Sequence, residues 1–134
     1  MKVKGVLLKF DVPNGDGLHD AISKDCKIDI PDKVPIVDEC AMEYPPIGFA
    51  NVTRTNEGLI FKGEVVSPYS DAIAGMIKDN KTVGAGGYYT EVKRDVHGFI
   101  FEMTLRAVCC VGMPVNPDYK FEIVKDESQY SDES

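Results

Sequence analysis

Short apolar stretches separated by turn-forming residues follow one another along most of the chain. Alternation with a period of two is typical of a strand with one buried face, and a short continuous apolar run is typical of a fully buried strand. On this basis we expect strands at residues 3–10, 26–30, 34–37, 47–55, 59–66, 83–94, 99–111 and 119–125. In the long stretch 99–111 every second residue from Phe99 to Val111 is apolar, which predicts one continuous buried face.

Only one stretch has a helical period. Ile73, Met76 and Ile77 recur at i, i+3 and i+4, and Ser67 and Pro68 ahead of them suit the start of a helix that ends near residue 80. Turn residues at 11–17, 56–58 and 95–98 separate the strands on either side. The predicted class is therefore α+β: a β-rich, mostly antiparallel sheet or barrel with one short packed helix.

A cluster of small residues marks the start of the stretch 83–94. Gly84, Gly86 and Gly87 surround Ala85. Glycine is entropically costly in a strand, so such a cluster usually indicates a turn, a bulge or a close backbone approach. In many enzymes a turn of this kind presents a nucleophile, but the side chain of Ala85 carries no reactive atom.

Length and charge narrow the function classes. The 134 residues suit a single domain, which we expect at 1–124, and residues 125–134 read as an acidic tail with four carboxylates and three serines. The formal net charge of -7 disfavours binding to nucleic acid. No apolar run is long enough to span a membrane, and the start of the chain lacks the features of a signal peptide. We expect a location in the cytosol or in a particle assembled inside the cell.

Cysteine spacing gives little support to a metal site. The four cysteines, Cys26, Cys40, Cys109 and Cys110, form no Cys-x-x-Cys pair and have no histidine at a matching interval. We expect them to be buried reduced thiols that act as small hydrophobic side chains, and we expect no metal and no cofactor.

The other candidates for chemistry are few. His19 and His97 fall in predicted loops, and no serine lies in a pattern that indicates a nucleophile with a base. Asp38 and Glu39 directly follow an apolar strand, and paired carboxylates can do acid–base work if their environments separate their pKa values. A solvated loop pair is the favoured interpretation, because no second polar cluster accompanies them. The residues alone indicate a β-rich domain that is not an enzyme.

The order of motifs resembles the prohead (capsid maturation) protease family of tailed phages, which shares its fold with herpesvirus assemblin. The resemblance covers about residues 4–121. Residues 34–37 resemble the strand before the family's histidine, and Pro46-Ile-Gly-Phe-Ala50 resembles the next strand. Asn56-Glu-Gly-Leu-Ile60 resembles the family's hairpin. Residues 77–88 resemble the helix end with the nucleophile strand, and residues 107–117 resemble the terminal motif.

The departures from the family pattern decide what the resemblance implies. Asp38 or Glu39 stands where the family has its histidine, Ala85 stands where it has its serine, and Ala107 stands where a glutamate usually opens the terminal motif. Loss of both nucleophile and base removes the covalent mechanism. The resemblance therefore implies a protease-like fold without proteolytic activity.

In a phage, such a relative is expected to be a structural protein of the virion, namely an auxiliary, decoration (cement) protein bound to the major capsid protein. It would be assembled in the host cytoplasm, and a homo-oligomer on the capsid would fit this role. One alternative is a maturation protease with a rebuilt site that uses Cys109, activated by Arg106, or the Asp38 and Glu39 pair. Another is a scaffold or regulator that acts only during assembly.

Overall fold

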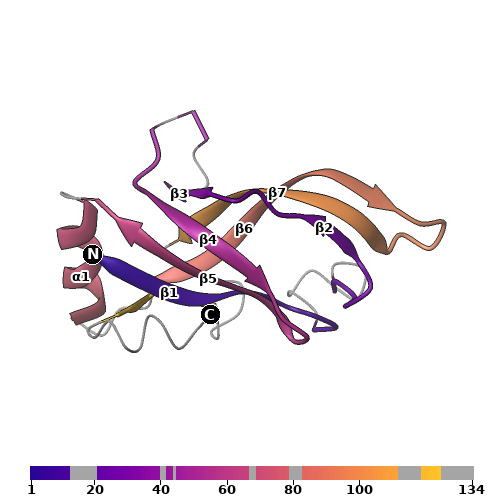
Figure 1. The fold of residues 1–134 in the computed structure, drawn as a ribbon, viewed down its shortest axis with the longest axis horizontal. Helices are drawn as coiled ribbons and strands as arrows, with labels where there is room; N and C mark the ends of the chain where they lie inside the picture. The colour runs from indigo at the N-terminus through magenta and orange to yellow at the C-terminus, as the bar shows by residue number, and fades with distance from the viewer. Residues whose placement is uncertain are drawn as a thin grey trace.

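A computed structural model describes residues 1–12, 21–39, 42–43, 45–66, 69–78, 83–111 and 119–124. The described chain is rich in strands and has one helix, as the alternation of apolar residues predicts (Figure 1). The elements in chain order are β1 (Lys2–Lys9), β2 (Lys27–Asp29), β3 (Val34–Asp38), β4 (Gly48–Arg54), β5 (Gly58–Val65), α1 (Tyr69–Lys78), β6 (Gly84–Arg94), β7 (Ile100–Val111) and β8 (Glu122–Ile123).

The strands form one mostly antiparallel sheet in the order β2-β7-β3-β4-β5-β1-β8, with β6 on the remaining edge of β7. β2 and β3 are the exceptions, because both run parallel to β7 and follow one another along the same edge of that strand. The predicted fold class, β-rich and mostly antiparallel with one short helix, is therefore confirmed.

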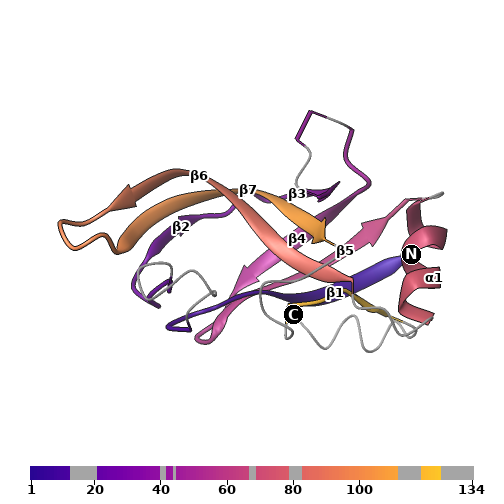
Figure 2. The ribbon, with the colours of Figure 1, turned by 180° about the vertical axis from the view of Figure 1, so that it is seen from behind.

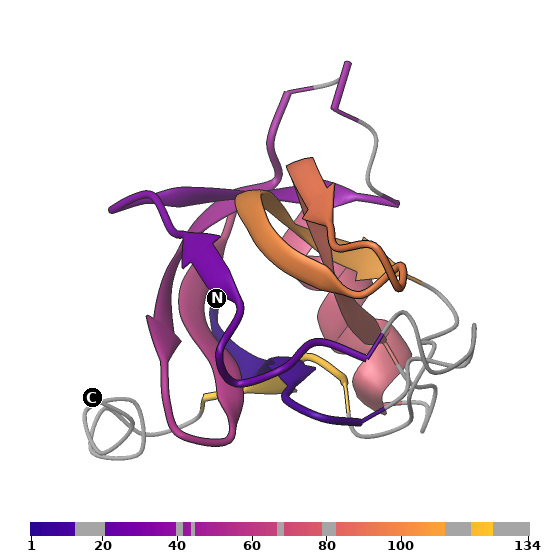
Figure 3. The ribbon, with the colours of Figure 1, turned by 90° about the vertical axis from the view of Figure 1, so that its right-hand side faces the viewer.

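The last described segment, 119–124, closes the sheet on itself. It pairs with β1 at Val3 and Ile123, and it exchanges backbone hydrogen bonds with the start of β6, from Ala85 N to Tyr119 O and from Phe121 N to Val83 O. The strands thus surround one interior, as the end-on view shows (Figure 3). α1 covers one end, and the β6–β7 hairpin projects from the other (Figures 1 and 2).

A single large cluster of buried apolar side chains fills this interior. At its centre the rings of Phe61 and Phe121 pack at 5.0 Å with an interplanar angle of 53°. Gly5 pairs with Phe61 in the β1–β5 ladder, and a Cβ atom there would lie 2.8 Å from the Phe61 ring and would collide with the backbone oxygen of Lys120. The missing side chain at Gly5 is what lets the closing segment approach β1.

Gly84, Gly86 and Gly87 all lie within β6 and pair with β7, in agreement with the expected strand at 83–94. Of the turn, bulge or close approach that the glycines were expected to mark, a close approach occurs at Gly87, where an added Cβ would collide with the Tyr89 side chain. One expectation about β7 is wrong. The continuous buried face of 99–111 is interrupted: Tyr88 pairs with Ala107 but Tyr89 pairs with Leu105, so one extra residue bulges from β7. Such a bulge turns the following side chains to the opposite face.

The consequence is visible in the burial pattern of β7. Met103 and Leu105 belong to the central core, but beyond the bulge Val108 and Cys110 take that role. Ala107 and Cys109 join Val37 in a separate, smaller cluster. The predicted acidic tail, 125–134, and the predicted helix-capping residues Ser67 and Pro68 lie outside the described residues.

Replacement of Gly5 by valine is expected to weaken the closure of the barrel. The added side chain must displace either the Phe61 ring or the 119–124 backbone, and overpacking of this kind costs ~1–3 kcal/mol. Thermal and chemical unfolding of Gly5→Val measures the loss. Gly86→Ala is the matched control, since an added Cβ there meets nothing within 4 Å. Equal stability of Gly5→Val and the parent would contradict this account of the closure.

Candidate functional site

The sheet brings two of the sequence-derived candidates into one row. β3 runs parallel to β7 with Asp38 opposite Cys110, and β6 runs antiparallel to β7 with Ala85 opposite the same Cys110. Asp38 and Ala85 therefore flank Cys110 on neighbouring strands. Glu39 follows directly, in a left-handed backbone conformation with φ 51°, and its N–H donates to the Cys110 carbonyl at 2.8 Å.

A small pocket of about 190 Å³ lies over this row, at the end of the barrel that α1 covers. Asp38, Glu39 and Cys110 are among the residues that line it, together with Tyr69 and Ile73 of α1. Both Asp38 and Glu39 are exposed, so they are a solvated pair, as the sequence favoured. Ala85 is buried, with 2% of its surface accessible.

The chemistry available in this pocket depends on whether the Cys110 thiol is protonated. Among the described residues lining the pocket, the Cys110 sulfur is the only thiol or aliphatic hydroxyl. Burial raises the pKa of the Cys110 thiol to about 12, and the charges of Asp38 and Glu39 add to the effect. Because the thiolate is the nucleophilic form, this thiol is unreactive near neutral pH.

The structure does not bring Ala107 to the row. Ala107 pairs with Tyr88 and belongs with Val37 and Cys109 to the smaller cluster beyond the β7 bulge. The four positions derived from the family pattern therefore divide into two groups, with Asp38, Glu39 and Ala85 at the pocket end and Ala107 apart from them.

Cys109 departs from the expectation of four reduced thiols. It is disulfide-bonded, whereas Cys26 and Cys110 are free and buried. Since Cys26 and Cys110 are free, the partner of Cys109 lies outside the described residues. Arg106, the residue expected to activate Cys109, instead donates from Nε to the Thr90 hydroxyl at 2.7 Å. A sulfur held in a disulfide and without solvent exposure is not a nucleophile.

No group of three or more metal-ligating side chains occurs among the described residues. His97 lies in the exposed turn between β6 and β7, and His19 lies outside the described residues. In the described part of the chain, no helix is long and apolar enough to cross a membrane.

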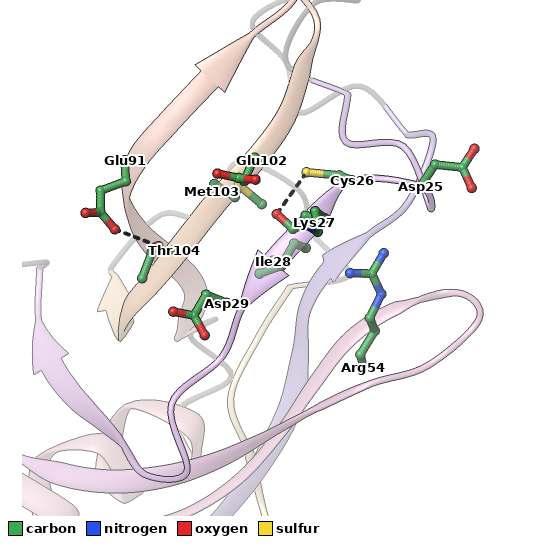
Figure 4. Close-up of a pocket in the computed structure, with 10 residues that line it drawn as sticks. All are labelled: Asp25, Cys26, Lys27, Ile28, Asp29, Arg54, Glu91, Glu102, Met103 and Thr104. Carbon is green, nitrogen blue, oxygen red and sulfur yellow. Dashed lines mark hydrogen bonds between the residues drawn. The ribbon is translucent and has the colours of Figure 1, made fainter.

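A second feature was not found from the sequence. A groove of about 660 Å³ lies between β2 and the base of the β6–β7 hairpin (Figure 4). Four carboxylates and two cationic side chains line it: Asp25, Asp29, Glu91, Glu102, Lys27 and Arg54. Residues 25–29 and 91–102 are far apart in the sequence and meet through the parallel pairing of β2 with β7.

Native Cys110 is expected to resist alkylation by iodoacetamide at pH 7. Its labelling rate should rise only as the pH approaches 12, because burial disfavours the charged thiolate and raises the pKa of this thiol. Cys26, whose pKa burial also raises, should behave in the same direction. Unfolding without reductant should expose both thiols and leave Cys109 unlabelled, as mass spectrometry of the peptides can show. Rapid labelling of native Cys110 at pH 7 would instead indicate an activated thiolate.

No protein-family model matches the sequence, and no curated protein matches it. Solved structures do resemble the fold. The structure of KSHV protease in complex with a hexapeptide phosphonate inhibitor aligns at 11% identity with a TM-score of 0.55, covering 98% of this chain and 67% of that one. A second structure of KSHV protease aligns at 14% identity with a TM-score of 0.49, covering 98% and 64%.

At these identities the likeness concerns the fold alone. The first alignment covers 98% of this chain, so the likeness extends over nearly all of it. The expected herpesvirus assemblin-like fold is thereby confirmed: this chain has the fold of a herpesvirus protease.

Proposed function

We propose that this protein is a proteolytically inactive relative of the tailed-phage prohead proteases that serves as a structural protein of the virion. Its role is that of an auxiliary, decoration protein that binds the major capsid protein on the head. The order of sequence motifs and the protease-like fold support this assignment together. The location that follows is the capsid, after assembly in the host cytoplasm.

The observation that carries the proposal is the row formed by Asp38, Cys110 and Ala85. A methyl group occupies the position where the resemblance places the serine nucleophile, and a carboxylate occupies the position of its base. Covalent catalysis needs a nucleophile and a base within hydrogen-bond reach. Ala85 has no reactive atom, and burial raises the pKa of the neighbouring Cys110 thiol to about 12, so it is not a ready substitute. A closed barrel with an intact core but without a catalytic nucleophile and base can still present a surface that binds capsid protein.

Charge supports a protein partner over a nucleic acid. The net charge of -7 repels phosphate backbones and favours docking on basic patches of a protein shell. The family that the chain resembles acts during capsid assembly, so retained affinity for capsid protein is a direct route from protease to decoration protein.

Co-sedimentation with mature, empty capsids of the parent phage tests this function. Saturable binding at a fixed ratio to the major capsid protein is expected, and bound shells should resist heat or denaturant better than bare shells because the ligand binds only the assembled state. Bovine serum albumin, also an acidic protein, serves as the control for charge alone. Absence of binding to mature shells would refute the decoration role.

A protease with a rebuilt site is the second candidate, and the free thiol of Cys110 beside two carboxylates is the observation that favours it. Fluorophosphonate and iodoacetamide-type activity probes distinguish the two functions. We expect neither probe to label the native protein faster than the unfolded one. Labelling of Cys110 that is lost on unfolding would support the rebuilt protease.

An assembly-stage scaffold or regulator is the remaining alternative. Such a protein would bind immature proheads and would be absent from mature particles, which gel analysis of purified virions can decide.

A further inference from the structure

The β6–β7 hairpin extends beyond the barrel as an arm, here defined as residues 91–102 (Figures 1 and 2). Four large apolar side chains on it are exposed, out of nine such side chains among the described residues: Val92, Val96, Phe99 and Phe101. Val96, in the turn, is 96% exposed, and Phe101 is 48% exposed. Turns are normally polar, and a concentration of exposed apolar side chains indicates an interaction surface.

The tip of the arm is rigid. The Asp95 carboxylate accepts hydrogen bonds from the N–H groups of His97 and Phe99 at 2.9 and 3.0 Å. Gly98 N–H donates to Asp95 O at 3.0 Å, and the Arg94 guanidinium donates to Gly98 O at 2.8 Å. These bonds hold the backbone of the turn that carries Val96, which lowers the entropic cost of binding.

The base of the arm is fixed as well. Glu91 adopts φ 54° at a bulge in β6, and its carboxylate accepts a hydrogen bond from the Thr104 hydroxyl at 2.9 Å. The Arg106 guanidinium lies 3.6 Å from the same carboxylate. Lys93 Nζ and Glu102 Oε2 form an ion pair at 2.7 Å across the two strands. These contacts join both bulged strands and set the direction in which the arm leaves the barrel.

The groove described above lies at this base, because Glu91 and Glu102, the two ends of the arm, are among the residues that line it (Figure 4). Three of its six charged groups have the partners named here: Glu91 and Glu102 as above, and Arg54, which donates to the Lys24 carbonyl at 2.6 Å and stacks on the Phe10 ring at 4.8 Å. The carboxylates of Asp25 and Asp29 are exposed and have no side-chain partner among the described residues. They are therefore available to a cation from outside.

We propose that the arm and the acidic groove together bind a cationic, partly apolar segment of another protein. The apolar side chains of the segment pack on Val96 and Phe101, and its lysine or arginine side chains pair with Asp25 and Asp29. Charge complementarity selects this occupant, because Asp25 and Asp29 present exposed carboxylates without side-chain partners in the described part of the chain, and the whole chain carries -7. A second copy of the chain brings the same negative charge and is disfavoured.

Titration of the ¹⁵N-labelled protein with a nine-residue peptide of alternating lysine and leucine tests the surface. Amide shifts should cluster in residues 91–102 and 25–29, and added salt should weaken binding. Peptides that alternate lysine with serine, or glutamate with leucine, should bind at least about tenfold more weakly. Shifts located elsewhere, or equal binding of the three peptides, would overturn the proposal.

Two double variants probe the two halves of the surface. Val96→Ser with Phe101→Ser, and Asp25→Asn with Asp29→Asn, should each weaken peptide binding about tenfold or more. The matched controls are Phe49→Ser, which removes a phenylalanine that is 47% exposed on β4, and Glu64→Gln on β5. Unchanged affinity in both double variants would refute the inference, as would arm-dependent dimerisation in sedimentation, which would make a second copy the occupant.

The idea that this surface faces the capsid rests on the proposed function. The same variants distinguish an error in the proposed surface from an error in the proposed function. If the parent protein binds shells and both double variants bind equally well, the surface is wrong and the decoration role stands. If the peptide binds at the arm and no protein binds shells, the decoration role fails and the surface stands.

Discussion

Closure of the barrel depends on one close approach, between the segment 119–124 and β1 at Gly5. There the chain passes over the Phe61 ring, and Phe121 brings a second ring against it from the closing segment. The same segment exchanges hydrogen bonds with both β1 and the start of β6, so it joins the two strands that would otherwise be edges. An open sheet would expose unpaired backbone groups and half of its core, and the closed form avoids both costs.

The hairpin formed by β6 and β7 is buried in the barrel at one end and exposed to solvent at the other. Near the closure its strands carry Ala85 and Cys110, and Cys110 also lines the pocket beside α1. At the far end the same strands leave the barrel and present exposed valine and phenylalanine side chains. The hairpin thus has a pocket with one buried thiol near one end and a group of exposed apolar side chains at the other.

The bulge at Arg106 separates these two ends. It moves Ala107 and Cys109 out of the central core and allows Val108 and Cys110 to enter it. The Arg106 guanidinium donates a hydrogen bond to the Thr90 hydroxyl and lies near the Glu91 carboxylate. Both residues are on β6, and this strand has a bulge of its own between Thr90 and Lys93. A local irregularity in one strand is therefore matched by one in its neighbour, and the pair defines where the barrel ends and the arm begins.

The strands, the helix and most turns followed from the sequence alone, because alternation, helical spacing and residues such as Asn56 and Gly98 act over a few positions. The resemblance in motif order also singled out Asp38 and Ala85, which the sheet places on either side of Cys110. Which residues share a face beyond Arg106 was decided only in three dimensions, since a bulge depends on how many residues the partner strand supplies. The acidic groove likewise required the parallel pairing of β2 with β7, which unites segments more than sixty residues apart, and the disulfide at Cys109 required a partner that spacing alone did not indicate.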